Sequence, residues 1–325
     1  MPVLLSENDV RAVLSMDDLI DSMEGALRQY SAGHVVQPLR TVLQVGGHAF
    51  FGVMPATIEH PPIVGTKLVT VYGSNAARGL PTHLATIVLM DYDTGELLAI
   101  LDGRYITEAR TAAASAVSVR HLARPSAKTL AVIGAGVQAR SHIEALTRVR
   151  PIEEIRIWSR TDERVRSLID ELGTHVRARM RPCASVSEAV HGAEVIALVS
   201  AAREPILRHE WVPAGAHICA VGACRPDQRE METAVVKNAR VFVDSRIGAL
   251  AEAGDIVIPI REGAFDASHL TGELGELADG RVPGRRDAAE ITIFKSLGMA
   301  VEDVAAARLA WERASERGLG RGFVL

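Results

Sequence analysis

The sequence has little cysteine and no long apolar run. Its three cysteines, Cys183, Cys219 and Cys224, have no metal-type spacing and are too scattered to suggest a disulfide framework. No segment approaches the roughly 18 consecutive apolar residues that a membrane-spanning helix needs, and the first residues lack the basic start and apolar stretch of a signal peptide. We therefore expect a cytoplasmic protein with no membrane partner and no metal site.

An excess of charge of either sign is also missing. The 36 lysines and arginines nearly balance the 40 aspartates and glutamates, and the formal net charge of -4 gives no general attraction to nucleic acid. Hydrophobic residues make up 48% of the 325 residues, which is enough for a large buried core. A chain of this length favours two domains. The composition predicts a globular protein of enzyme size without a nucleic-acid partner.

The first part of the chain predicts a helix followed by an antiparallel sheet. Ser6 and Ser15 are each followed by an aspartate three residues later, a helix N-cap pattern, and apolar residues behind Ser15 repeat at steps of four and three until Gly33. Strand-prone segments follow at 41–45, 50–54, 64–72 and 86–91, and the last continues through a turn at 93–95 into 97–101 as a hairpin. An alanine-rich helix is predicted at 106–123.

A different rhythm begins after the break at Arg124-Pro125-Ser126. Apolar strands alternate with helices, which is typical of a Rossmann-type, doubly wound parallel sheet. The fold class is therefore α/β, with a Rossmann domain at residues 124–299 and a mixed α+β domain at residues 1–123 with 300–325, onto which a last helix at about 299–317 packs. The predicted strands are 129–133, 154–158, 176–180, 194–199, 217–221 and 241–244.

The strand at 129–133 runs directly into a G-x-G-x-x-A pattern, Gly134-Ala135-Gly136-Val137-Gln138-Ala139. The first glycine permits a tight turn, the second lets backbone N–H groups approach a pyrophosphate, and the small Ala139 lets the helix pack closely on the strand. The alternative is a glycine-rich turn without a ligand. The strand before the pattern and the helix after it favour a dinucleotide site.

The position expected to read the adenosine ribose carries a basic residue where an NAD site usually has an acid. The next strand ends in Trp158-Ser159-Arg160-Thr161. Arg160 can pair with a 2′-phosphate, and the hydroxyls of Ser159 and Thr161 can donate to it. The alternative is that Ser159 and Asp162 only cap the following helix. The sequence favours NADP(H), with NAD(H) possible.

Three basic residues, Arg40, Lys67 and Arg110, stand among apolar or small neighbours. Buried cations need partners, and a carboxylate substrate is one such partner. Taken singly, each is more often a solvated or salt-bridged side chain. The residue pattern alone leaves the substrate open.

Six separate segments, in this order along the chain, match one family: Gly65-Thr66-Lys67, Gly79–His83, Arg110–Ser115, Gly134–Ala139, Gly222–Glu230 and Phe294–Met299. On these segments the chain resembles the ornithine cyclodeaminase/mu-crystallin family over nearly its whole length. The resemblance implies a homodimer formed through the sheet of the first domain, which would also bind the substrate. It further implies that Arg40, Lys67 and Arg110 hold the substrate carboxylate and neighbouring polar groups. Five residues would lie near the cofactor: Thr82, His83, Thr111, Val199 and Ser200.

One departure from the cyclodeaminase pattern concerns Cys224. By resemblance, ornithine cyclodeaminases carry an aspartate there, after a strand, that acts on the substrate amine and on water. This chain has Gly222-Ala223-Cys224-Arg225-Pro226-Asp227, which is more similar to the mu-crystallin, ketimine reductase branch. Ring-closing deamination needs a base to handle the amine, so a cysteine at this position argues against the lyase hypothesis. We take Cys224 as a candidate cofactor-binding residue.

The resulting hypothesis is reduction, by NAD(P)H, of a cyclic ketimine carboxylate such as pyrroline-2-carboxylate or piperideine-2-carboxylate to proline or pipecolate. Arg110 and Arg40 would clamp the carboxylate, and Lys67 would raise the electrophilicity of the imine or relay a proton. Three alternatives remain: an ornithine or lysine cyclodeaminase with recycled NAD, an open-chain amino-acid dehydrogenase, and a non-catalytic protein that binds NADPH and a ligand.

Overall fold

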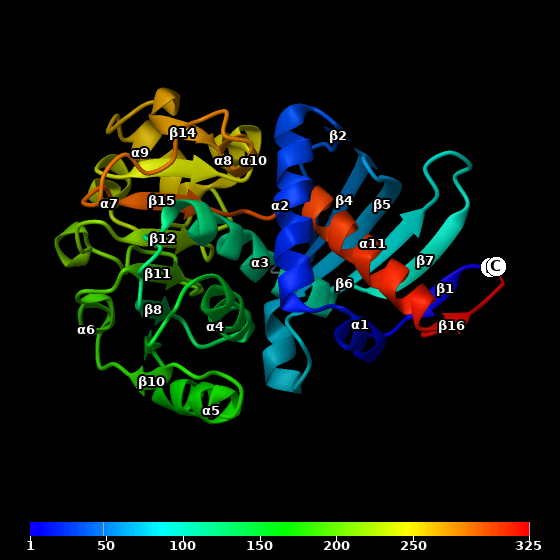
Figure 1. Cartoon of the computed structure of the whole chain (residues 1–325), viewed down its shortest axis with the longest axis horizontal. Helices are drawn as coiled ribbons and strands as arrows, with labels where there is room; N and C mark the ends of the chain where they lie inside the picture. The colour runs from blue at the N-terminus through cyan, green and yellow to red at the C-terminus, as the bar shows by residue number, and fades with distance from the viewer. Residues whose placement is uncertain (48, 325) are drawn as a thin grey trace. The chain divides into compact units, whose positions relative to one another are not determined.

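The chain forms two compact units (Figure 1). The computed structural model describes residues 1–47 and 49–324. Unit 1 comprises Met1–Arg110 with Gly298–Leu325, and unit 2 comprises Thr111–Leu297. The domain boundaries predicted from sequence, at 123/124 and 299/300, assign the alanine-rich helix differently, and the separate roles of the two domains stay predictions.

Unit 1 begins with two capped helices. They are α1 (Glu7–Val13) and α2 (Met16–Ala32). The hydroxyls of Ser6 and Ser15 each accept the backbone N–H of the residue three positions later, and Gly33, at φ 85°, ends α2. The apolar stripe of α2 is buried, which confirms the helix that the spacing predicts.

The sheet of unit 1 is mainly antiparallel, as expected. Its order is β16-β1-β7-β6-β5-β4-β2, with β3 paired to β4. The carboxylate of Asp91 accepts the N–H groups of Asp93 and Thr94, so the β6–β7 turn forms the predicted hairpin. Helix α11 (Ala300–Glu316) packs on α2, β4 and β5, as the sequence predicts. The strands are β1 (Val3–Leu5), β2 (Val35–Val36), β3 (Thr41–Val45), β4 (Ala49–Glu59), β5 (Pro62–Tyr72), β6 (His83–Met90), β7 (Leu97–Asp102) and β16 (Arg321–Gly322), and a 3₁₀ segment, η1 (Gly73–Arg78), follows β5.

The alanine-rich helix is α3 (Arg104–Leu122), and the unit boundary falls within it. Unit 2 then contains a parallel sheet of order β10-β9-β8-β11-β12-β15-β13-β14, which confirms the doubly wound fold. The chain runs outward from β8 to β9 and β10, then returns to β11 on the other side of β8, so the switch point lies between β8 and β11. The strands are β8 (Thr129–Ile133), β9 (Glu154–Trp158), β10 (Arg179–Pro182), β11 (Val195–Leu198), β12 (His217–Ala220), β13 (Arg240–Val243), β14 (Leu270–Glu273) and β15 (Thr292–Lys295).

Helices follow most of these strands. The central strands β8, β11 and β12 are almost wholly buried because helices and other side chains cover both faces. The helices are α4 (Val137–Val149), α5 (Asp162–Leu172), α6 (Val186–Val190), α7 (Thr233–Lys237), α8 (Arg246–Glu252), α9 (Gly254–Arg261) and α10 (Leu274–Ala278), with 3₁₀ segments η2 (His209–Trp211) and η3 (Ala267–His269). None of the helices in residues 1–47 and 49–324 is long and apolar enough to cross a membrane.

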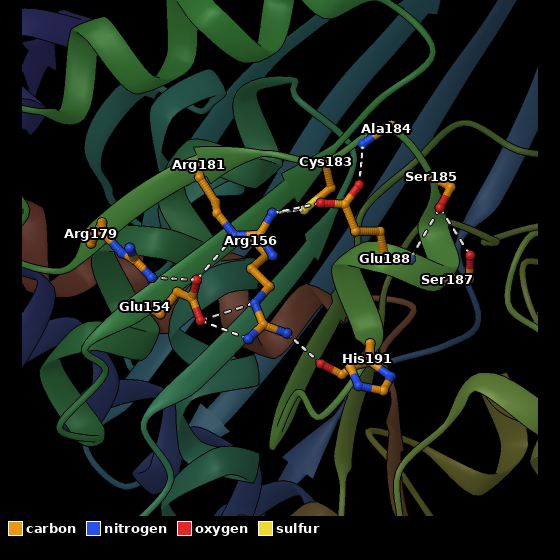
Figure 2. Close-up of polar contacts among 10 residues, drawn as sticks. All are labelled: Glu154, Arg156, Arg179, Arg181, Cys183, Ala184, Ser185, Ser187, Glu188 and His191. Carbon is orange, nitrogen blue, oxygen red and sulfur yellow. Dashed lines mark hydrogen bonds and ion pairs between the residues drawn. The ribbon is translucent and has the colours of Figure 1, made fainter.

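A charge network joins β9 and β10 (Figure 2). Glu154, at the first position of β9, accepts hydrogen bonds from Arg156, Arg179 and Arg181 at 2.7 to 3.1 Å. These hydrogen bonds, from Arg156 foremost, lower the pKa of Glu154 to about 2. The network lies toward the amino ends of the strands, away from the carboxyl ends where doubly wound sheets bind ligands, so its role is to stabilise the sheet.

Candidate active site

The turn after β8 requires a glycine at its first position. Gly134 has a φ of 131°, and its N–H donates to the Trp158 carbonyl at the end of β9 at 2.8 Å. A Cβ on Gly134 would lie 2.7 Å from the carbonyl oxygen of Val199, just beyond β11. The chain therefore turns sharply between the ends of two neighbouring strands, as the motif predicts.

Gly136 has a different reason to be glycine. It is the N-cap residue of α4 with no side-chain cap, and a Cβ there would meet nothing within 4 Å. Protein packing alone does not exclude a side chain, but a Cβ would occupy the open space before the free N–H groups of α4. The pyrophosphate of a dinucleotide fits this space, because helix N-termini favour anions. Ala139 is fully buried, which agrees with close helix–strand packing.

A cavity of about 610 Å³ lies in front of this turn. It brings together seven of the residues that the sequence singled out, while the others fall outside its lining. Val137 is exposed, the Gln138 carbonyl accepts from His142, and Cys224 donates its thiol to the Val221 carbonyl at 3.1 Å. Thr161 is the N-cap residue of α5, with no side-chain cap hydrogen bond. The seven that line the cavity are Gly134, Ala135, Gly136, Ser159, Arg160, Val199 and Ser200.

Three exposed arginines line the same cavity: Arg160, Arg164 and Arg203. Glu204 also lines the cavity, but within the described ranges none of the three arginines forms an ion pair with a carboxylate, so their guanidinium groups remain available to phosphates. Of these three arginines, the sequence predicted only Arg160 as a cofactor-binding residue. Arg164 was hidden because it looks like a solvated residue of α5, and Arg203 because it lies in an irregular loop.

A second set of charges lies inside unit 1. The ammonium of Lys67 on β5 is 2.5 Å from the Asp303 carboxylate of α11. The Arg110 guanidinium donates to Asp303 at 2.9 Å and to Glu302 at 2.5 Å. All four side chains are almost completely buried. The two cations were predictable from the sequence, but Glu302 and Asp303 were not, because acids in the first turn of a helix usually face solvent.

Burial and neighbouring charges shift the pKa values of this cluster. Burial, together with the Arg110 charge, lowers the pKa of Lys67 to about 8, although Asp303 opposes the shift. Burial also raises the pKa of Asp303, but the charges of Arg110 and Lys67 outweigh it and the net shift is downward. The cluster therefore holds an ionised carboxylate against a lysine whose pKa is well below its usual value.

The remaining predicted residues of unit 1 lie close to this cluster or on its elements. The guanidinium of half-buried Arg40 donates to the Gly298 carbonyl at 3.2 Å, and Gly298 has a φ of 79°. A Cβ on Gly298 would overlap the Arg110 guanidinium, so glycine makes room for that side chain. Burial and the Lys67 charge lower the pKa of His83, the first residue of β6, to about 4. Thr82 directly precedes this strand.

Two further groups outside these clusters concern the remaining predictions. Thr111 is buried in α3, in unit 2. His34, Glu59 and His60 are exposed, and potential metal-ligand atoms on them lie within 4.8 Å of one another, a grouping that sequence spacing did not indicate. His34 Nδ1 lies 2.9 Å from a Glu59 oxygen, and this hydrogen bond is sufficient to explain why the side chains meet.

Comparisons with known proteins agree with this geometry. The model of the ornithine cyclodeaminase/mu-crystallin family matches residues 1–318. The chain is 43% identical over 316 residues to ketimine reductase mu-crystallin from Rattus norvegicus, covering 96% of this chain and 97% of the relative. It is 37% identical to Thermococcus litoralis Delta(1)-pyrroline-2-carboxylate reductase, whose structure with NADH and L-proline superposes with a TM-score of 0.96 over 99% of this chain and 100% of that one.

An archaeal alanine dehydrogenase dimer with bound NAD is also similar, at 30% identity and a TM-score of 0.93, over 99% of each chain. These similarities extend over both units and agree with the dinucleotide geometry of the glycine turn. The chain therefore belongs to the ornithine cyclodeaminase/mu-crystallin family.

Proposed function

We propose that this chain reduces a cyclic ketimine carboxylate, pyrroline-2-carboxylate or piperideine-2-carboxylate, to proline or pipecolate with a nicotinamide cofactor. It is an NAD(P)-dependent oxidoreductase that acts on a C=N bond, as its reductase relatives are. This proposal rests on the buried cluster of Lys67, Arg110 and Asp303. In this cluster a lysine that can donate a proton lies near an arginine that can bind a carboxylate.

Charge balance supports a monoanionic substrate. Arg40, Lys67 and Arg110 supply three positive charges, whereas Glu302 and Asp303 supply two negative ones, so the cluster has one positive charge in excess. A single substrate carboxylate neutralises it. Arg110 is fixed by two carboxylates, which orients its guanidinium plane, while half-buried Arg40 is the more accessible cation.

Lys67 is our choice for the proton donor. When bound, the reduced nicotinamide supplies a hydride to the imine carbon. The Lys67 ammonium gives a proton to the imine nitrogen, so that C=N becomes CH–NH and both charges balance. An ordinary lysine holds its proton too tightly at neutral pH, but a pKa of about 8 brings Lys67 close to the working range. Asp303 keeps the ammonium in place until the transfer.

The cofactor preference is proposed to be NADP(H), with NAD(H) possible. Arg160, Arg164 and Arg203 line the cavity, and a 2′-phosphate adds two negative charges for such groups to bind. Ser159 is in the same lining, and no acidic residue from the end of β9 is. The family relative from Thermococcus litoralis was captured with NADH, so the comparison of both cofactors is the direct test.

A homodimer in the cytoplasm is the proposed state. Strand β3 is exposed along its whole length, and its apolar Val42, Leu43 and Val45 stand among the exposed large hydrophobic residues of unit 1. An exposed apolar edge of this kind offers a surface for pairing with another chain. The similar alanine dehydrogenase is a dimer. The three cysteines are free, and isolated thiols suit a reducing compartment.

The test follows oxidation of NADPH and NADH by absorbance with pyrroline-2-carboxylate, piperideine-2-carboxylate, and pyruvate with ammonia. We expect turnover with a cyclic imine and a higher kcat/KM with NADPH. Turnover only with pyruvate and ammonia would instead identify an open-chain amino-acid dehydrogenase, the function of the archaeal relative. Ammonia release from ornithine or lysine without net cofactor oxidation would identify a cyclodeaminase and refute the proposal.

A further inference from the structure

A buried carboxylate, Glu230, links the ends of two strands of the parallel sheet. One of its oxygens accepts the backbone N–H of Ser200 at 3.0 Å and the Ser200 hydroxyl at 2.6 Å. The other accepts the backbone N–H of Gly222 at 2.8 Å. Ser200 follows β11 and Gly222 follows β12, and the Glu230 side chain is fully buried. One carboxylate therefore satisfies three donors from two loops.

The contact between these loops leaves no spare room. A Cβ on Gly222 would overlap both the Ser200 carbonyl oxygen and the Glu230 carboxylate. Only glycine at this position lets the loop after β12 approach the loop after β11 so closely. The spacing of the two loops is thus set by the Glu230 carboxylate and by the missing side chain at Gly222.

Two more buried charges stand behind Glu230. Asp255 accepts the backbone N–H groups of Glu230 and Met231 at 2.9 and 3.1 Å, and the Lys295 ammonium lies 3.2 Å from its other oxygen. Glu230, Asp255 and Lys295 are all fully buried. With both acids ionised the group carries one negative charge more than positive, so the backbone donors on Glu230 are needed to stabilise it.

Ser200, which Glu230 holds, lies where its position can affect dinucleotide binding. Ser200 lines the cavity that contains Gly134, Ala135 and Gly136. In doubly wound sheets the adenosine ribose is bound beyond the strand that follows the glycine turn, here β9, and the dinucleotide crosses the switch point. The other half of the dinucleotide consequently lies on the β11 side, where Ser200 is.

We propose that Glu230 is a positioning residue that holds Ser200 and Gly222 in place, so that the loop after β11 forms the wall of the dinucleotide cavity. The inference rests on the proposed function in one respect, that the cavity binds a nicotinamide dinucleotide. Loss of the carboxylate charge would release one strand end and weaken dinucleotide binding, without any contact between Glu230 and the reacting atoms.

The pH dependence of dinucleotide affinity distinguishes a positioning role of Glu230 from a purely structural one. Burial, and then the charge of Asp255, raise the pKa of Glu230 to about 7. Lys295 opposes that shift, and Cys224 is a further titratable group that acts on Lys295. Below neutral pH the protonated carboxyl has one oxygen that donates rather than accepts. We therefore expect dinucleotide affinity of the wild type to fall as the pH drops through about 7.

The test uses Glu230→Gln in the full chain, because the amide has nearly the same volume but only one accepting oxygen. Dissociation constants for NADPH and NADH are measured by fluorescence titration between pH 5.5 and 8.5, together with thermal denaturation. We expect about a tenfold higher Kd at pH 8 and loss of the pH dependence near 7, relative to wild type. Titration of the cofactor phosphate is common to both proteins and cancels in the ratio. Glu232→Gln, a half-exposed neighbour, is the matched control and should leave the Kd unchanged.

The outcomes separate the two proposals. If the wild type binds neither cofactor, the proposed function fails. If the wild type binds but Glu230→Gln has the same Kd at every pH, even with a lower Tm, Glu230 is only structural and the inference is overturned. If Glu230→Gln does not fold, Ser200→Ala decides, because it removes one donor without altering a buried charge. A raised Kd that retains the wild-type pH dependence is then expected, and an unchanged Kd overturns the inference.

Discussion

Asp303→Asn is the substitution that most directly probes the buried charges of unit 1. It replaces a carboxylate that contacts Lys67 at 2.5 Å and Arg110 at 2.9 Å with a neutral amide of nearly equal size. Removing one partner of a buried ion pair typically costs about 3–5 kcal/mol, because the other charge stays in a medium of low polarity. About 1 kcal/mol lowers the Tm of a domain of 150–250 residues by roughly 2–4 °C. We expect a Tm lower by about 10 °C.

The same substitution should move the pH profile of the reaction. The Asp303 charge is the main factor that raises the pKa of Lys67 against the effect of burial, so its loss drives that pKa below about 8. If the Lys67 ammonium is the proton donor, activity falls as the pH rises through the pKa of Lys67. The alkaline limb of the kcat/KM profile should therefore shift to lower pH in Asp303→Asn.

A double-mutant cycle supplies the control. Lys67→Met with Asp303→Asn leaves no unpaired charge between these two positions, so its loss of stability should be smaller than the sum of the single losses. Stability is measured by urea denaturation followed by circular dichroism. Additive losses, with a coupling free energy near zero, would refute the reasoning that these side chains form an energetically important pair. An unshifted alkaline limb would remove Lys67 from the mechanism.

Three further predictions use other parts of the molecule. Arg160→Ala should raise the Kd for NADPH about tenfold, or about 1.4 kcal/mol, and leave the Kd for NADH unchanged; equal effects on both cofactors would argue against a 2′-phosphate contact. Glu154→Gln should lower the Tm above about pH 4.5, and the difference from wild type should vanish as the pH falls toward 2, since the depressed pKa of Glu154 means that its ionised form contributes stability only above that range. Exposed Glu153→Gln is the control and should show no such trend. Leu43→Asp on β3 should convert a dimer into a species of 34.9 kDa in light scattering; an unchanged dimer would place the interface elsewhere.

Much of the fold could be predicted because its signals are local. The glycine turn after β8, the caps of α1 and α2 and the β6–β7 hairpin each depend on residues within a few positions of one another. Strand β14 escaped prediction because Leu270 is its one apolar residue, and β15 because it ends in a buried lysine that looks like a solvated one. Their burial comes from neighbours distant in sequence, which periodicity does not register.

The sequence predicted the cations of the candidate site but not the carboxylates that pair with them. Lys67 and Arg110 stood out because cations among apolar residues are unusual, but Asp303 lies nearly 200 residues from Arg110 in the sequence. Glu230 was noticed only as part of a family motif, and its three donors became visible with the strand ends in place. Long-range pairing is what single-sequence reasoning lacks.

Strand β15 is synthesised after the strands on either side of it, and this order limits when the sheet of unit 2 can be completed. This strand lies between β12 and β13 in the middle of its sheet, yet it is the last of that sheet to leave the ribosome. Until residue 295 has been synthesised, β12 and β13 expose unpaired backbone edges facing a gap. Helix α11 completes unit 1 only a few residues later. Both units must therefore wait until residues 292–316 have been synthesised, and a product terminated before them would expose the interior of the sheet rather than its margin.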